Sequence, residues 1–227
     1  MKHLWILAAL LLATSNTSHG QRPLPHGLYL GQQPPGSTPV PFAPGLITSA
    51  GWEYGGTFSP DLEEFYFIRE VDADTDPRQE FVVYRRTDAG WQETVISPRV
   101  GQPFISPDGK TMHLGRRYKK RSGDGWSEIK PLGAPFDDMP IMRLTASEAG
   151  TYFLDEPGTD GDGIVRYSRL IDGQHETPRP LPKEINTGTW NAHPFVAPDE
   201  SYLIWDGRRD GGYGCLLYTS DAADDLA

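Results

Sequence analysis

The sequence predicts an all-β protein. Glycine (25 residues) and proline (21 residues) are frequent in a chain of 227, and aromatic residues make up 11%; this composition is typical of short strands joined by many turns. No segment shows a sustained helical period, and one pattern recurs every 40 to 51 residues. Each repeat contains signals for two hairpins. Two hairpins give four antiparallel strands, which is one blade of a β-propeller.

The first hairpin of each repeat contains a turn of the Ser-Pro-Asp type. The four copies read GGTFSPDLEEFYF from Gly55, QPFISPDGKTMHL from Gln102, MRLTASEAGTYFL from Met142 and HPFVAPDESYLIW from His193. Proline presets φ, and the aspartate carboxylate can accept a backbone N–H bond from two residues further on. The residues assigned to these turns are Pro60, Asp61, Pro107, Asp108, Pro198 and Asp199. The third copy departs from the pattern, with Ala146-Ser147-Glu148 in its place. Alternating apolar residues then predict the second strand.

A second hairpin follows in the first three repeats. Asp-Gly or Asp-Ala-Gly separates two predicted strands, which is a strong short-range hairpin signal. Trp91 and Trp126 follow this turn in two copies, and His175 takes the position in the third. Most of the tryptophans are expected to pack between blades.

The ordered series of motifs resembles a known family. FSPD, ISPDGK, EINTGTWNAHPFVAPDESYLIWDGRRDGGYG and the opening LYLGQQPPGSTPVPFAPGLI are similar to the bacterial WD40-like β-propeller repeats of the TolB type. The resemblance runs from about Leu28 to Gly214. Propellers of this family usually have six blades, so the resemblance implies an incomplete ring of about three and a half four-stranded blades.

The N-terminus has the features of a signal peptide over residues 1–20. Lys2 precedes an apolar run from Leu4 to Ala13, and the small residues Ser18 and Gly20 precede a cut before Gln21. About ten apolar residues are too few to span a bilayer, which needs roughly 20. The sequence therefore predicts a periplasmic or extracellular protein without membrane insertion.

The C-terminal stretch CLLYTSDAADDLA, residues 215–227, breaks the repeat. It is similar to a translated sequencing adapter, which would confine the propeller fragment to residues 21–214; the alternative is a native acidic C-terminus. We expect such a fragment to expose an unpaired strand edge near Tyr202 to Trp205 and to self-associate, whereas the full-length protein is expected to be a monomer. The segment from Leu28 is expected to meet the far end of the ring.

Charge and cysteine content exclude several classes. A net charge of −10 gives no electrostatic footprint for nucleic acid, and the basic run from Arg116 to Arg121 is interpreted as solvated strand and turn positions. The only cysteine, Cys215, lies in the atypical tail, so no disulfide, thiol nucleophile or cysteine metal site is expected.

We expect no metal or other cofactor. The run DADTD at Asp72, Asp74 and Asp76 lacks the glycine and glutamate of a calcium loop, and it is interpreted, like Asp160 and Asp162, as a solvated acidic loop. The acidic residues of the four turns are Asp61, Asp108, Glu148 and Asp199. Six positions before each of them, where an inner strand of a propeller starts, the repeats carry a single histidine among four residues: Gly55, Gln102, Met142 and His193.

The leading hypothesis is a binding module for a protein or a glycan. The candidate contact residues are His193, Gln102 and Arg143 at the mouth of the channel and Trp190 in a loop. No nucleophile motif such as G-x-S-x-G is present, so no catalytic residue is assigned. The alternative is a hydrolase or lyase with its site in the central channel, since some propellers of this general type are lyases that use several histidines around Mn²⁺. That alternative requires further histidines or paired carboxylates.

Overall fold

The computed structural model describes residues 24–34, 36, 38–74, 76–158 and 163–210, and the backbone of 216–220. The predicted signal peptide, Asp160, Asp162, Cys215 and residues 221–227 lie outside this part of the chain. No helix among the described residues is long and apolar enough to cross a membrane.

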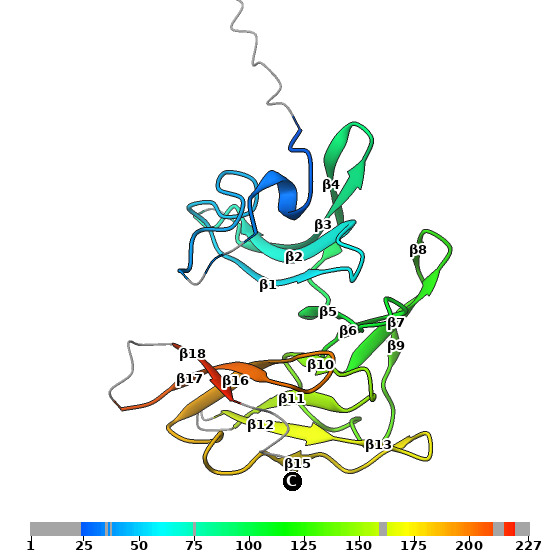
Figure 1. Cartoon of the computed structure of the whole chain (residues 1–227), viewed down its shortest axis with the longest axis vertical. Coiled ribbons are helices and arrows are strands. Elements are labelled where there is room, and N and C mark those ends of the chain that lie inside the picture. Colours follow the sequence, from blue (N-terminus) through cyan, green and yellow to red (C-terminus); the bar gives the residue numbers. More distant parts are fainter. Residues whose placement is uncertain are drawn as a thin grey trace, which may run out of the picture.

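The described residues form an all-β structure of successive antiparallel sheets (Figure 1). The first sheet contains β1 (Glu53–Phe58), β2 (Glu64–Val71), β3 (Arg78–Thr87) and β4 (Gly90–Pro98) in that order. The second contains β5 (Pro103–Ile105), β6 (Thr111–Leu114), β7 (Arg117–Ser122), β8 (Gly125–Trp126) and β9 (Lys130–Pro131). The third contains β10 (Leu144–Ala146), β11 (Tyr152–Pro157), β12 (Gly163–Ser168) and β15 (Arg179–Pro180), with the hairpin β13 (Leu170–Ile171) and β14 (Gln174–His175) beside it. The fourth contains β16 (Trp190–Val196), β17 (Leu203–Arg208) and β18 (Leu216–Ser220).

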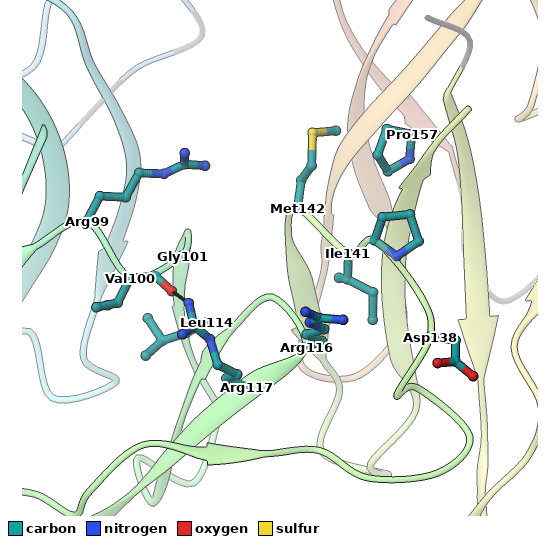
Figure 2. Close-up of a pocket in the computed structure, with 11 residues that line it drawn as sticks. Arg99, Val100, Gly101, Leu114, Arg116, Arg117, Asp138, Ile141, Met142 and Pro157 are labelled. Carbon is teal, nitrogen blue, oxygen red and sulfur yellow. Dashed lines mark hydrogen bonds between the residues drawn. The ribbon is translucent and has the colours of Figure 1, made fainter. Parts of the chain in front are cut away.

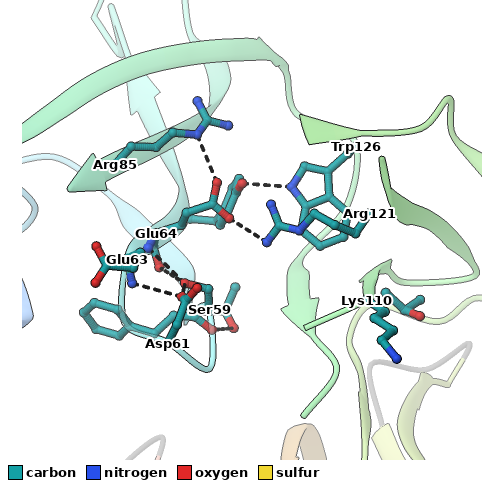
Figure 3. A network of polar contacts seen from close by, with 12 residues as sticks. Ser59, Asp61, Glu63, Glu64, Arg85, Lys110, Arg121 and Trp126 are labelled. Carbon is teal, nitrogen blue, oxygen red and sulfur yellow. Dashed lines mark hydrogen bonds and ion pairs between the residues drawn. The ribbon is translucent and has the colours of Figure 1, made fainter. Parts of the chain in front are cut away.

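The Ser-Pro-Asp turns form where the repeats predict them. In the second turn, Ser106 Oγ donates to Asp108 Oδ1 at 2.6 Å and accepts the Thr111 N–H at 2.9 Å. Asp108 Oδ1 also accepts the Lys110 N–H at 2.9 Å, which is the predicted bond from two residues further on. The equivalent bonds in the first turn join Ser59, Asp61, Glu63 and Glu64 (Figure 3).

The degenerate third turn also forms, and it uses the fourth repeat to do so. Ser147 Oγ accepts the Thr151 N–H at 3.1 Å, as its counterparts do. In the structure Ser147, and not Ala146, takes the place of Ser106, so Ala149 stands where Asp108 stands and offers no carboxylate. The Ser147 hydroxyl donates to Glu200 Oε1 at 2.5 Å instead. The Glu148 N–H donates to the Pro198 carbonyl at 2.8 Å. The third and fourth turns therefore lie side by side, and the fourth supplies the acceptors for hydrogen bonds of the third.

Replacing Ser106 by alanine is expected to lower the free energy of unfolding by about 1–2 kcal/mol, because the buried Thr111 N–H loses its acceptor. Chemical denaturation of Ser106→Ala against the exposed control Ser122→Ala measures this. The fourth turn carries Ala197 at the equivalent position and still forms, so the hairpin should survive. Equal stability of the two variants would show that the hydroxyl does not hold the turn.

Consecutive sheets pack face to face. One apolar cluster lies between the first and second sheets and joins Tyr66, Ile68, Phe81, Val83, Ile105, Met112 and Leu114. Another lies at the third sheet and joins Phe136, Ile141, Leu144 and Leu154. A further cluster joins the third and fourth sheets through Phe153, Val165, Leu181, Ile185, Val196, Leu203 and Trp205. The first strands also touch in sequence, β1 with β5, β5 with β10 and β10 with β16.

The central strands are buried on both faces, which differs from the simple alternation predicted from the repeats. In β2, Phe65 and Phe67 face one side, and Tyr66 and Ile68 face the second sheet. A strand between two packed layers has no solvent face, so both residue sets become core.

A polar network also joins the first two sheets (Figure 3). Glu64 is 8% exposed and pairs with Arg85 at 3.0 Å and Arg121 at 2.7 Å. The Arg121 guanidinium lies 4.0 Å from the centroid of the Trp126 ring, whose Nε1 donates to Tyr66 Oη at 2.8 Å. Arg121 is thus half-buried between the sheets, not solvated as its basic run suggests.

The segment before β1 covers the outer face of the first sheet (Figure 1). It includes the 3₁₀ turn η1 (Tyr29–Gly31), and its side chains Leu30, Ala43 and Ile47 pack against that face. Trp91 fastens it, because Nε1 donates to the Gly27 carbonyl at 2.7 Å. The sequence predicts that this segment meets the far end of a ring; in the structure it packs on the adjacent sheet.

The strand edge expected to be open near Tyr202 to Trp205 is occupied. β18 pairs with β17 from Leu203↔Ser220 to Gly207↔Leu216. Part of the atypical tail therefore takes the outer position of the fourth sheet. No strand pairing among the described residues joins the first sheet to the last.

Candidate functional site

The first strands of the sheets border one pocket of about 590 Å³. Its walls come from the ends of β1, β5 and β16 and from the residue just before β10, so all four repeats contribute. The lining residues are Gly56, Thr57, Phe58, Ser59, Pro60, Leu62, Phe65, Phe104, Ile105, Pro107, Arg143, Glu148, Phe195, Val196 and Pro198.

The walls are mainly apolar. Phe104 and Phe195 meet edge to face with ring centroids 6.4 Å apart, which joins the second repeat to the fourth. Phe58 and Phe65 lie 4.7 Å apart on the opposite wall. A mostly apolar pocket with a few polar groups is the usual form of a ligand site.

Arg143 is the cation of this pocket. Its Nε is buried and has no hydrogen-bond partner among the described residues. Burial lowers the pKa of Arg143, and the carboxylates of Asp155 and Asp206 act in the opposite direction. An arginine stays charged in proteins, so a ligand acceptor that reached Nε would satisfy a buried donor.

Asp155 organises the backbone next to the pocket. This side chain is 0% exposed, and its Oδ1 accepts the N–H groups of Met142 at 3.0 Å and Arg143 at 2.9 Å. Its Oδ2 accepts the N–H of His193 at 2.8 Å. Burial raises the pKa of the Asp155 carboxyl, and the three amide bonds and His193 offset part of that shift. One carboxyl group therefore fixes the backbone just before β10 in the third repeat and at the irregularity of β16 in the fourth.

His193 is held in a fixed orientation. It lies at an irregularity of β16 between Ala192 and Phe195, with φ of +52°. Its Nδ1 lies 2.8 Å from Asp206 Oδ1. Burial lowers the pKa of His193, but the hydrogen bond and charge of Asp206, together with Asp155, outweigh it and the pKa is raised. The imidazole is thus biased toward its protonated form.

The four residues proposed from the sequence do not form one site. The structure brings the backbones of Arg143 and His193 together at Asp155, and of these two residues only Arg143 lines the pocket. Gln102 is only 6% exposed, beside Gly55, and does not line this pocket. Trp190, expected in a loop, is half-buried at the first position of β16 and pairs with Arg208.

The other histidines and the acidic loop do not join the site. His113 is buried 5.0 Å from Tyr152, and His175 stacks on the same ring at 3.9 Å. Asp72 pairs with Arg78. Among the described residues, no group of three or more histidine, cysteine, aspartate or glutamate side chains is placed to hold a metal ion.

Sequence reasoning missed Asp155 and Asp206. Each lies seven residues after the aligned acid of its repeat, Glu148 or Asp199. The first two repeats carry Ile68 and Gly115 there, so an acid at this position marks the third and fourth repeats. Among the tryptophans that the structure describes, the exposed one is Trp52, at 63%, and not Trp190.

Comparison with known proteins adds no assignment, since no family model matches the sequence and no curated protein matches it significantly.

Proposed function

We propose that the sheets are blades of a β-propeller and that the protein is an exported, TolB-like binding module. The repeat, the meander order of the strands and the contacts between consecutive first strands support the propeller assignment. The signal-like N-terminus supports export. One observation carries the binding role: all four repeats converge on one apolar pocket lined by Arg143, whose buried Nε has no hydrogen-bond partner among the described residues.

The pocket favours a protein partner over a glycan. Its phenylalanine walls offer apolar contact area and few polar groups, whereas a sugar ring presents hydroxyls on all sides. A peptide segment can pack an apolar side chain against Phe104 and Phe195 and place a carboxylate or carbonyl oxygen near Arg143. Buried aromatic and arginine anchors of this kind dominate many protein interfaces.

Selection from a random peptide phage library, with a glycan array in parallel, tests this role. We expect peptides with an apolar and an acidic residue to be enriched, and their affinity to fall about tenfold or more in Phe195→Ser and in Arg143→Gln. Val95→Ser, a 46% exposed position on β4, is the control and should bind normally. Glycan binding lost in the same variants would assign a glycan instead, and binding unaffected by either variant would exclude this pocket.

The second candidate function is a channel-sited hydrolase or lyase. One observation favours it: Asp206 orients the His193 imidazole through Nδ1, as a carboxylate orients a general base. Asp155 does not supply the paired carboxylate, because its bonds to three backbone amides occupy it. Product analysis after incubation with oligosaccharides and peptides separates the two roles. Cleavage by the parent protein that His193→Gln abolishes would assign the hydrolase or lyase role.

A further inference from the structure

A second pocket, of about 650 Å³, is lined by three arginines (Figure 2). Arg99 lies between β4 and β5, and Arg116 and Arg117 lie at the turn from β6 into β7. The opposite wall includes Met142 and Pro157. This pocket lies where the inner strands β5 and β10 begin. It is away from the turns that border the candidate site described above, called here the phenylalanine pocket after Phe58, Phe65, Phe104 and Phe195.

These three arginines are not neutralised by the protein. Eight other arginines form ion pairs with carboxylates: Arg69, Arg78, Arg85, Arg86, Arg121, Arg166, Arg169 and Arg179. Within the described part of the chain, no carboxylate pairs with Arg99, Arg116 or Arg117. Asp138 also lines the pocket but pairs with none of them. All three arginines are exposed, so they give this one pocket a concentrated positive charge in a chain whose net charge is −10.

The arginines are nevertheless positioned by uncharged groups. Arg116 donates to the Asp137 carbonyl at 3.1 Å, and Arg117 donates to the Val100 carbonyl. The Arg99 guanidinium lies 5.8 Å from the Tyr54 ring centroid. These contacts restrict the side chains without removing their charge, and each guanidinium retains other N–H donors.

Tight backbone packing gives the pocket a rigid floor. A Cβ added at Gly101 would lie 2.7 Å from the Leu114 carbonyl oxygen, and one added at Gly115 would lie 2.6 Å from that of Ile141. Both glycines have positive φ, 142° and 64°. Only glycine permits these approaches, so the loops that carry the arginines are fixed against each other.

We propose that this pocket binds a small polyanion that carries two or more carboxylate or phosphate groups. Guanidinium groups form bidentate, charge-assisted bonds with both kinds of oxyanion. One monovalent anion would leave most of the positive charge uncompensated, whereas a polyanion can engage several arginines and relieve their mutual repulsion. This site is separate from the phenylalanine pocket, and the inference does not depend on the role proposed there.

Isothermal titration calorimetry of the full chain with citrate and with pyrophosphate at low salt tests this inference. We expect at least one of them to bind with a dissociation constant below about 1 mM, and the neutral trisaccharide maltotriose not to bind. The preferred anion identifies the carboxylate or phosphate class. Affinity should weaken as salt is added, because the contacts are electrostatic.

Arg99→Gln and Arg116→Gln should each weaken binding about tenfold, and the double variant should abolish it. Arg78→Gln, which removes an exposed arginine paired with Asp72, is the matched control and should bind normally. Melting temperatures confirm that each variant is folded. Absence of binding by both anions, or binding that the double variant retains, would overturn the inference. Phenylalanine-pocket variants should leave anion binding intact, so the two proposals fail separately.

Discussion

Asp155→Ala is expected to lower the free energy of unfolding by about 3–5 kcal/mol. The fully buried carboxyl group accepts backbone N–H bonds from Met142, Arg143 and His193. Alanine would leave three buried donors without acceptors and would remove the charge that faces Arg143 and His193. Denaturant titration at neutral pH measures the loss, and the exposed control Glu184→Ala should stay within about 0.5 kcal/mol of the parent protein.

Asp155→Asn separates hydrogen bonding from charge. Asparagine keeps one acceptor oxygen, so it can retain bonds of the third repeat but not that of His193 as well. We expect a loss between that of the alanine variant and zero. If Asp155→Ala unfolds at the same denaturant concentration as Glu184→Ala, Asp155 does not join the third and fourth repeats.

Acidification is expected to destabilise the protein through His113. This side chain is 2% exposed, and its Nδ1 has no partner among the described residues. Burial lowers the pKa of His113 from 6.5 to about 3, and the positive charges of Lys120 and His175 act in the same direction. The fold therefore requires the neutral imidazole, whereas the unfolded chain protonates it near pH 6.5.

The sign of the effect follows from this difference. The contribution of His113 to the free energy of unfolding is constant above pH 6.5, and it falls by about 1.4 kcal/mol per pH unit below that value. The loss continues until the pH reaches about 3, for a total of about 5 kcal/mol. Carboxylates titrate over part of the same range, so the measurement is a comparison of variants.

His113→Leu should flatten the dependence of unfolding free energy on pH between 6.5 and about 4, relative to the parent protein. The exposed His26→Gln is the matched control and should keep the parental slope. The slope is the readout, since leucine can also change stability at neutral pH by altering the packing. Parallel curves for the parent and His113→Leu would refute the proposed titration.

Sequence alone determined the strands and most of the turns. The Ser-Pro-Asp and Asp-Gly signals act through bonds within a few residues of each other, as at Ser106 and Asp108. Such interactions are local, so they are readable from the chain without knowledge of its neighbours. The period of the repeat also located the degenerate third turn, but one residue away from its place in the structure, where Ser147 and not Ala146 matches Ser106.

The tertiary structure decided which side chains meet. Asp155 and His193 lie 38 residues apart and come together only when the third and fourth sheets pack. Arg99 and Arg116 lie on different connections and share a pocket only in the folded chain; Arg116 is exposed, as its basic run predicts. Gln102 is proposed from its position in the repeat and Trp190 from its position in a predicted loop, but packing buries the first and β16 incorporates the second. Strand patterns follow from backbone geometry, whereas a site depends on contacts between sheets, and no local rule specifies those contacts.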